Sequence, residues 1–363
     1  MQMIEFSDTQ RERYSRHILI PELGEEGQQR LQAAKVLCVG AGGLGSPALL
    51  YLAAAGVGTI GIVEFDNVEL SNLQRQIIHG TSDVGSSKAR SAAASIAELN
   101  PDVQVNVHDM RLDASNALDL VSQYDVVIDG TDNFPTRYLV NDACVLAGKP
   151  YVWGSVLRFE GQASVFWAEH GPCYRCVFPV APAPGMVPSC AEAGVLGAVC
   201  ATIGSVQVIE AVKLITGIGD PLVGRIHHLD ALASTVRTIE VKKNPECELC
   251  GPHARIRAVE ADQTAINAEE LITWLDARAA GERDFVLVDV REPAEHAQMN
   301  IKGSELIPLG AFADGTAISR LDPHAQIVLY CQAGVRSAQA LEVLKRAGFE
   351  RVVHLDGGIV TMR

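Results

Sequence analysis

The chain has 363 residues, a formal net charge of −14 and 48% hydrophobic residues, which is enough to build two domains with sizeable cores. No cluster of lysine and arginine is long enough to form the basic patch of a nucleic-acid-binding protein, so we expect no nucleic-acid partner. The N-terminus lacks the pattern of a signal peptide and the nine cysteines are an odd number. We therefore expect a cytoplasmic protein that uses cysteine for metal binding or thiol chemistry.

The first elements predict a helix, two buried strands and a glycine-rich turn between them. Ser7 and Gln10 have the spacing of a capping box that opens a helix. The elements that follow are a strand over 35–40, a helix over 46–56 and a strand over 58–66. Residues 44–63 carry no charge over a membrane-spanning length, but Pro47 and three glycines interrupt them. We therefore expect buried core elements here and no association with a membrane.

The middle of the chain continues the alternation of strands and helices and then departs from it. The expected elements are a helix over 86–99, a strand over 125–130, strands over 150–156 and 161–167, and a long buried helix over 198–217. Alternating strands and helices are typical of a parallel, doubly wound sheet of the Rossmann type. The two strands after Pro150 predict an antiparallel extension of that sheet.

The hydrophobic pattern weakens over residues 251–265, which we interpret as a linker between a first domain, 1–250, and a second, 266–363. The elements expected beyond it are strands in 285–292, 326–331 and 351–358 and a helix over 338–349. The fold class is therefore α/β in both domains, with a smaller second domain.

A glycine-rich turn follows the first strand, in the order that a nucleotide-binding motif requires. Its glycines are Gly40, Gly42, Gly43 and Gly45. Glu64 and Asp66 end the next strand, where an acidic side chain can hold ribose hydroxyls. These features predict an adenosine nucleotide without choosing between NAD and ATP.

Polar and cationic residues beyond the turn favour a triphosphate. They are Asn72, Arg75, Gln76 and Lys88. Taken singly, Arg75 and Lys88 are more often solvated helix charges, but the β- and γ-phosphates of ATP need such cations, whereas a nicotinamide does not. Asp132 comes just after a strand, at the edge where open α/β sheets place ligands, and its carboxylate could hold Mg²⁺ on the phosphates.

Two C-x-x-C pairs predict a structural zinc site. The pairs are Cys173 with Cys176 and Cys247 with Cys250. Four thiolates leave no ligand position open for water, which is typical of structural rather than catalytic zinc. The alternative, two unrelated pairs or a redox dithiol, is less favoured because both pairs occur in one chain without a secretion signal.

The segments "GAGGLGSP", "EFDNVELSNLQRQ", "DGTDN" and "CAEAGV" together resemble the MoeB/ThiF family, the bacterial relatives of ubiquitin-activating enzymes. The resemblance spans nearly all of residues 7–251. It implies ATP-dependent adenylation of the C-terminal glycine of a ubiquitin-like sulfur-carrier protein such as MoaD or ThiS. Glu64 stands where the family commonly has Asp.

The same resemblance assigns roles to individual residues. It implies that Asp132 is the catalytic, metal-binding acid and that Glu64 binds the ribose. It further implies that the phosphates are bound by Arg75, Gln76 and Lys88. It also implies that Arg16 reaches into the nucleotide site of a partner subunit, and therefore that the chain forms a homodimer. Cys190, in "VPSCAEAGV", occupies a position where some members keep a thiol that bonds covalently to the carrier, and a loop cysteine without a catalytic role is equally compatible.

In the second domain, "LVDVREP" and "CQAGVRS" resemble the rhodanese family of sulfurtransferases over about residues 262–359. Cys331 ends a strand and Gly334 lies in the loop that follows, so backbone N–H groups can surround the sulfur. These groups, the next helix N-terminus and Arg336 would stabilise a thiolate and a persulfide at Cys331. Asp289 and Arg291 are expected to brace this loop.

The two halves together predict adenylation of a carrier followed by sulfur transfer from a Cys331 persulfide, which a cysteine desulfurase would load. Two alternatives remain open. A nicotinamide oxidoreductase has no use for Lys88, the cysteine pairs or the Cys331 loop, and a non-catalytic scaffold for a ubiquitin-like protein would bind without turnover. The sequence does not choose among molybdopterin (molybdenum cofactor), thiamine, cysteine and thiolated-tRNA pathways.

Overall fold

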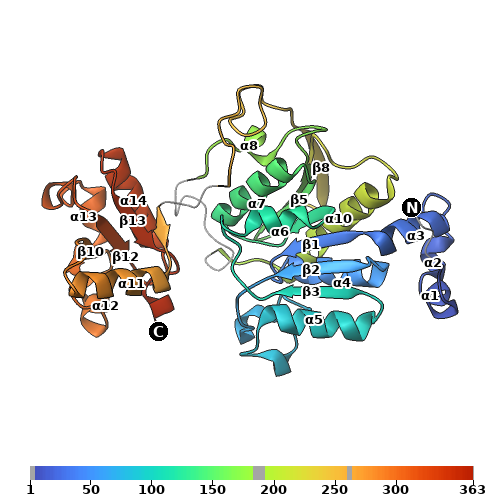
Figure 1. Cartoon of the computed structure of the whole chain (residues 1–363), viewed down its shortest axis with the longest axis horizontal. Helices are drawn as coiled ribbons and strands as arrows, with labels where there is room; N and C mark the ends of the chain where they lie inside the picture. Colours follow the sequence, from blue (N-terminus) through green and yellow to red (C-terminus); the bar gives the residue numbers. More distant parts are fainter. Residues whose placement is uncertain (1–4, 183–192, 260–263, 363) are drawn as a thin grey trace. The chain divides into compact units, whose positions relative to one another are not determined.

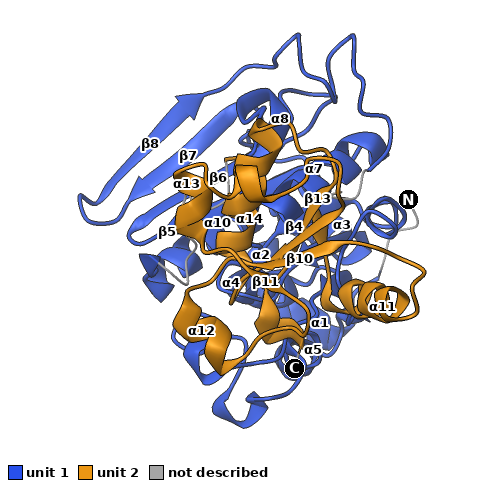
Figure 2. Cartoon of the chain, turned by 90° about the vertical axis from the view of Figure 1, so that its left-hand side faces the viewer, with its two compact units in different colours: residues 1–181, 189–261 blue, residues 182–188, 262–363 orange. Residues whose placement is uncertain are grey.

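The computed structural model describes residues 5–182, 193–259 and 264–362 (Figure 1). The chain falls into two compact units, coloured separately in Figure 2. Residues 1–181 and 189–261 form the first unit, and residues 182–188 and 262–363 form the second. The first unit therefore contains the glycine-rich turn and both cysteine pairs, and the second contains Cys331.

The first unit is built on an eight-stranded sheet with the order β3-β2-β1-β4-β5-β6-β7-β8. The strands are β1 (Lys35–Val39), β2 (Thr59–Val63), β3 (Gln104–His108), β4 (Val126–Asp129), β5 (Tyr151–Leu157), β6 (Glu160–Phe166), β7 (Arg225–Asp230) and β8 (Thr235–Glu240). Neighbours from β3 through β5 pair in parallel, and those from β5 through β8 pair antiparallel. This mixed sheet confirms the predicted doubly wound domain with an antiparallel extension.

Helices cover both faces of the sheet. They are α1 (Asp8–Arg13), α2 (Ser15–Ile18), α3 (Gly24–Ala33), α4 (Gly45–Ala55), α5 (Lys88–Leu99), α6 (Ala117–Ser122), α7 (Phe134–Ala147), α8 (Tyr174–Val177) and α10 (Gly197–Thr216). Alternate residues of the central strands enter two cores: Val36 and Cys38 pack with α4, α5 and α10, whereas Leu37 and Val39 pack with α6 and α7. The strands β1 and β4 are almost wholly buried because both faces are covered.

Two helix boundaries follow directly from the residues that were expected to set them. Ser7 and Gln10 form the predicted capping box at the start of α1. The long helix α10 ends at Gly217, whose positive φ of 75° closes the helix in the left-handed conformation.

By length and composition alone, α10 could cross a membrane, and 44% of its apolar window is buried. It packs against α4, β5 and β6, so the fold uses it as a core helix. The uncharged run 44–63 likewise becomes α4 and β2, as expected.

The second unit has a five-stranded parallel sheet with the order β11-β10-β12-β13-β9. Its strands are β9 (Ala265–Ile266), β10 (Val286–Asp289), β11 (Glu305–Leu306), β12 (Ile327–Tyr330) and β13 (Val352–Leu355), and its helices are α11 (Ala268–Ala279), α12 (Pro293–Gln298), α13 (Leu309–Ala313) and α14 (Val335–Arg346). The predicted α/β fold is therefore confirmed here too. The two-residue strands β9 and β11 are too short to produce a hydrophobic pattern of their own.

Candidate active sites

The glycine-rich turn lies at the edge where β1, β2 and β4 end. Gly40 has a φ of 93° and rests against Gly130, which follows β4: a Cβ on Gly40 would lie 3.1 Å from the Gly130 carbonyl oxygen. A Cβ on Gly45 would lie only 2.0 Å from the Gly40 carbonyl oxygen. Both positions therefore require glycine, because the backbone doubles back on itself and on the next strand.

Glu64 fastens this turn. One carboxylate oxygen accepts the Ala41 N–H at 3.1 Å, and the other accepts the N–H groups of Phe65 and Asp66 at 2.8 and 2.9 Å. The side chain is buried, so these three bonds fix its position. A ribose contact by Glu64, as the resemblance implies, would use the lone pairs that remain.

Lys88 and Asp66, both expected to bind the nucleotide, bind one another. The Lys88 ammonium lies 3.0 Å from the Asp66 carboxylate. The Lys88 side chain is only 8% exposed, whereas that of Asp66 is 54% exposed. Lys88 is thus a buried cation held at the start of α5, and the alternative that it is a solvated helix charge is excluded.

The short segment before Lys88 brings the remaining polar residues to the turn. Gln76 is buried with its side-chain carbonyl unpartnered, and its amide nitrogen would lie 3.7 Å from a Cβ on Gly42. Arg75 lies beside Gly43, together with Cys200 at the start of α10. Asn72 is buried and caps its own turn by accepting the Glu69 N–H. The structure therefore places Arg75 and Gln76 beside the glycines, and Asn72 on the short turn just before them in the chain.

Asp132 stands exposed on the loop between β4 and α7. Asp129, at the end of β4, holds the base of this loop: its carboxylate accepts the Thr131 N–H at 2.9 Å and the Thr131 hydroxyl at 2.6 Å. Its other oxygen accepts the Tyr151 hydroxyl at 2.5 Å. Burial raises the pKa of Asp129, and the nearby Arg137 opposes that rise. Asp132, the acid that the resemblance assigns to Mg²⁺, is therefore exposed on a loop whose base is held in place.

Two buried residues, one at this loop and one at the glycine turn, have no sequence motif that would have predicted them. Arg137 is buried, and one of its terminal nitrogens donates to the Thr131 carbonyl at 3.4 Å. His79 is also buried and links the Ala41 carbonyl, at 3.1 Å, to the Ser91 hydroxyl, at 2.8 Å. The hydrophobic periodicity could not distinguish either residue from an ordinary helix or loop position.

Two predicted catalytic residues of the first domain are not gathered at this edge by the described structure. Arg16 is exposed on α2. Cys190 lies outside the described residues, so its predicted role stays a prediction.

The two cysteine pairs converge as predicted. Cys173 Sγ lies 3.7 Å from Cys176 Sγ and 3.6 Å from Cys247 Sγ, and Cys176 Sγ lies 3.4 Å from Cys250 Sγ. All four sulfurs fall within 4.8 Å of one another. Tetrahedral zinc with Zn–S bonds of about 2.3 Å requires sulfur separations of about 3.8 Å, so the cluster fits zinc. Hydrogen bonds among these thiols lower the pKa of Cys176 and raise that of Cys173, so the first thiolate forms at Cys176.

Cys331 follows β12 and is buried under the loop that leads into α14. Its sulfur accepts the Gly334 N–H at 3.1 Å and lies 3.5 Å from the Ser337 hydroxyl. Gly334 needs its φ of 88° to turn this N–H inward. The predicted loop around the sulfur is present, and the helix begins at Val335.

Two ion pairs support the Cys331 loop. Arg291 binds the Asp289 carboxylate through two nitrogens and donates to the Gln332 side chain at 3.1 Å, which is the bracing expected for this pair. Arg336 forms a two-pronged bond with Glu295, at 2.7 and 2.6 Å. Glu295 was not predicted, because an acid on a short exposed helix has no signal of its own.

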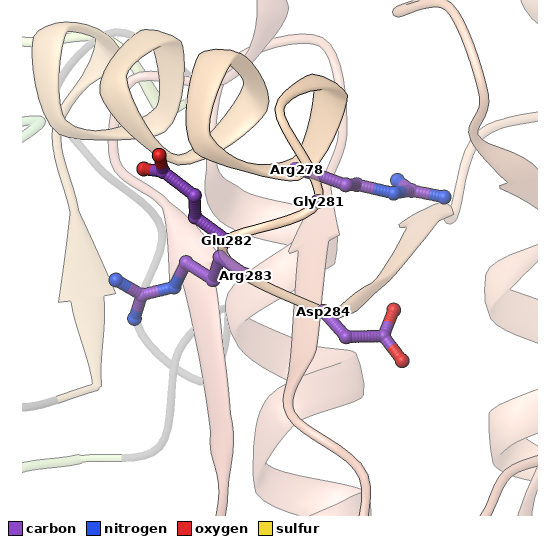
Figure 3. Close-up of a pocket in the computed structure, with 5 residues that line it drawn as sticks. All are labelled: Arg278, Gly281, Glu282, Arg283 and Asp284. Carbon is purple, nitrogen blue, oxygen red and sulfur yellow. The ribbon is translucent and has the colours of Figure 1, made fainter.

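A shallow hollow also occurs at the turn after α11, lined by Arg278, Gly281, Glu282, Arg283 and Asp284. Figure 3 shows that Arg278 and Asp284 extend to one side of the turn and Glu282 and Arg283 to the other. The Arg283 guanidinium stacks 3.4 Å from the centre of the Trp274 ring. These side chains do not converge on a common point, so the hollow is no candidate for a reaction site.

The first unit holds a nucleotide-type turn, an acidic loop and a Cys₄ cluster, and the second holds a cysteine whose sulfur accepts a backbone N–H. Together these features define a two-domain adenylyltransferase and sulfurtransferase. The ThiF family model matches residues 14–249, and the rhodanese-like domain model matches residues 269–362. The chain belongs to the ThiF family and carries a C-terminal rhodanese-like domain, which confirms both resemblances. The interpretations as a nicotinamide oxidoreductase and as a scaffold without activity are set aside.

Two curated relatives match over 96% of this chain, and a third matches over 66% of it. The chain is 55% identical over 362 residues to a probable adenylyltransferase/sulfurtransferase MoeZ of Mycobacterium tuberculosis, covering 96% of this chain and 91% of that protein. It is 39% identical over 375 residues to the adenylyltransferase and sulfurtransferase MOCS3-2 of Zea mays, covering 96% and 78%. It is 52% identical over 245 residues to the sulfur carrier protein adenylyltransferase of Thermus thermophilus, covering 66% and 90%.

Solved structures share the fold. A crystal structure of E. coli MccB with AMPCPP and SeMet MccA matches with a TM-score of 0.60 at 21% identity, covering 68% of this chain and 75% of that one. A crystal structure of SeMet PaaA matches with a TM-score of 0.57 at 24% identity, covering 67% and 76%. At these identities the likeness concerns the fold alone.

Proposed function

We propose that this protein adenylates the C-terminal carboxylate of a ubiquitin-like sulfur-carrier protein and then converts it into a thiocarboxylate. One observation carries the proposal: a single chain joins the glycine turn of the first unit to Cys331 of the second, whose sulfur accepts the Gly334 N–H. Relatives named as a sulfur carrier protein adenylyltransferase and as a SAMP-activating enzyme E1 support a protein carrier as the substrate.

In the first step a carboxylate oxygen of the carrier attacks the α-phosphorus of ATP, and the bond to pyrophosphate breaks. The product is an acyl-adenylate, a mixed anhydride that is far more reactive than the carboxylate. In this proposal Lys88, which is buried beside Asp66, and Arg75, which lies beside Gly43, stabilise charge on the leaving pyrophosphate, and the glycines let the phosphates approach the backbone. Mg²⁺ at Asp132 would neutralise further phosphate charge.

In the second step the terminal sulfur of a Cys331 persulfide attacks the acyl carbon, and AMP leaves. The Gly334 N–H and the Ser337 hydroxyl contact the Cys331 Sγ, where in this proposal they stabilise the negative charge of the thiolate before it is loaded with sulfur. The resulting acyl disulfide needs a thiol that attacks the Cys331 sulfur, releases the thiocarboxylate and forms a disulfide with Cys331, which a thiol reductant then restores. Cys190 is our candidate for that thiol.

The remaining assignments are part of the same proposal. The Cys₄ cluster holds zinc as a structural ion, because four thiolates leave no position for substrate. A cysteine desulfurase loads Cys331 with sulfur. Two chains form a homodimer in which Arg16, exposed on α2, serves the nucleotide site of the partner.

The proposal is tested by incubating the full chain with ATP, a cysteine desulfurase, cysteine and candidate carriers from the molybdopterin, thiamine and thiolation pathways. Mass spectrometry of each carrier should show one C-terminal oxygen replaced by sulfur. Cys331→Ala should block this change while leaving carrier-dependent ATP–pyrophosphate exchange intact. Absence of such exchange with every carrier would overturn the proposal.

A further inference from the structure

Arg336 is the charged residue of the segment 331–336, and its guanidinium is paired with a carboxylate. The Glu295 carboxylate binds it through both oxygens, at 2.7 Å to Nη1 and 2.6 Å to Nη2. Each side chain is about one-third exposed, so the pair lies at the surface beside the loop. Arg336 is also close enough to interact electrostatically with Cys331.

A second arginine contacts the loop, and it is also paired with a carboxylate. Arg291 reaches Gln332 through Nη1, while its Nε and Nη2 bind Asp289. His296 approaches the same Asp289 carboxylate at 2.9 Å. Among the described residues, both arginines at this loop are therefore paired with carboxylates, which neutralise their charge.

Sulfur donors differ in the negative charge that they bring to such a loop. Thiosulfate is a dianion, and its recognition favours a cation that is not already paired. A cysteine persulfide on another protein carries at most one negative charge on its terminal sulfur, and its affinity comes from the protein around it. A neutralised loop therefore disfavours the first donor far more than the second.

We propose that Glu295 sets the donor specificity of the Cys331 site: by neutralising Arg336 it directs the site toward a protein-bound persulfide and against small dianionic donors. This inference rests on the proposed function, in which Cys331 carries the sulfur. Glu295 is a specificity-determining residue that acts through Arg336, and it touches neither sulfur.

The transfer balances for both donors without an oxidant or a reductant. The Cys331 thiolate attacks the outer sulfur of the donor, the new S–S bond forms, and the old S–S or S–sulfonate bond breaks. A protein persulfide leaves as its thiolate, and thiosulfate leaves as sulfite. The donor alone differs, so the two reactions can be compared in one protein.

Glu295→Gln is the decisive variant. Gln at this position can keep the capping box of α12, in which the Glu295 side chain accepts the Glu292 N–H, while the charge on Arg336 is released. We expect the KM for thiosulfate, measured by thiocyanate formation with cyanide, to fall about three- to tenfold, as for one partly exposed charge. Persulfide loading of Cys331 by a cysteine desulfurase should change less than twofold.

Two further variants isolate the cause. Glu295→Gln combined with Arg336→Gln should abolish the fall in the thiosulfate KM, because the released cation is gone. Glu305→Gln breaks another Arg–Glu pair of the same 2.6 Å length, with Arg320, and should leave both donors unaffected. If Glu295→Gln slows both donors equally, or leaves the thiosulfate KM unchanged, Glu295 has only a structural role and the inference is wrong.

Failure of the inference and failure of the proposed function give different results. If wild-type Cys331 accepts sulfur from the desulfurase but Glu295→Gln does not alter thiosulfate use, only the role of Glu295 is overturned. If Cys331 accepts sulfur from neither donor, the sulfur-transfer half of the proposed function fails and the inference fails with it. ATP–pyrophosphate exchange in the same samples reports the adenylation half separately.

Discussion

At the scale of single residues, two acids of the loop after β4 differ in their surroundings. The first is buried and hydrogen-bonded at the base of the loop, and the second is exposed further along it. Asp129 is buried and accepts three hydrogen bonds, whereas Asp132 three residues later is exposed. The rigid part therefore positions the loop, and the free carboxylate is left for a ligand.

We expect Asp132→Asn to reduce carrier-dependent ATP–pyrophosphate exchange by about 100-fold or more, because a charge that stabilises the transferring phosphate is lost. The melting temperature should hardly change, since the side chain is exposed. Glu98→Gln, another exposed acid in the same unit, serves as the control and should keep full exchange activity. An active Asp132→Asn enzyme would exclude this residue as the metal-binding acid.

His79 gives the first unit a predicted pH dependence. Burial lowers the pKa of His79, so the folded protein keeps the ring neutral at a pH where the unfolded chain, with a pKa near 6.5, is protonated. The unfolded state then binds more protons, and the free energy of unfolding falls as the pH drops below about 6.5. This residue can contribute a slope of up to about 1.4 kcal/mol per pH unit.

Urea unfolding of the full chain between pH 7.5 and 5.5 checks this expectation. His79→Gln should make the first-unit transition less dependent on pH, although burial also lowers the pKa of His108 and His227, so some dependence remains. His253→Gln, an exposed histidine, is the matched control. Identical slopes for the two variants and the wild type would contradict a role for His79.

At the scale of elements, the Cys₄ cluster joins α8 to the last residues of the first unit. Cys173 immediately precedes α8, and Cys247 follows β8 by a short segment. Leu249 and Ile256 belong to a small apolar cluster around the sulfurs, and Tyr174 of α8 is buried in the larger core beside Phe166. A bound ion would therefore chiefly hold the segment 247–250 against α8.

We expect Cys247→Ser, or removal of zinc by a chelator, to lower the melting temperature of the first unit by roughly 10 °C, which corresponds to about 3–5 kcal/mol for a domain of this size. Calorimetry should show the second-unit transition unchanged, and elemental analysis should give one zinc per wild-type chain. Cys144→Ala removes a buried thiol outside the cluster and should retain the metal. A metal-free wild-type protein of undiminished stability would contradict a structural zinc.

Helices and strands could be predicted where the hydrophobic pattern repeats locally. They were hard to predict where pairing with a distant segment decides whether a strand forms. Alternating apolar runs and glycine-terminated helices give β1, β4 and α10 with boundaries within a few residues. By contrast, β9 is two residues long and exists because it pairs with β13. Pairing across the chain leaves no trace in a stretch that short.

The candidate sites divide in the same way. Motifs with fixed spacing revealed the glycine turn, the cysteine pairs and the Cys331 loop, because their chemistry requires those residues close together in sequence. Arg137, His79 and Glu295 act through contacts made by folding, so spacing could not reveal them. Nor does spacing show that Lys88 is buried against Asp66.

At the scale of the whole molecule, the proposed homodimer makes a sharp prediction. If Arg16 serves the partner's site and Asp132 its own, Arg16→Ala and Asp132→Asn chains should each be inactive alone. Mixed subunits contain one site with both residues intact. Random exchange in an equal mixture should restore about a quarter of wild-type exchange activity.

The mixture is measured by ATP–pyrophosphate exchange after co-refolding or co-expression of the two variants, with sedimentation to verify the assembly. A mixture of Arg16→Ala with Arg16→Ala/Asp132→Asn chains has no complete site and is the negative control. Recovery no greater than in that control would show that Arg16 acts within its own chain or not at all.

The spacing of the cysteine pairs also has a consequence for biosynthesis. Cys173 and Cys247, like Cys176 and Cys250, are 74 residues apart, and α10, β7 and β8 lie between them. During translation the first pair emerges well before the second, so a four-sulfur site cannot exist until those elements have been made. Metal capture would then mark the moment at which the ribosome has delivered a complete first domain, before most of the sulfurtransferase has been synthesised.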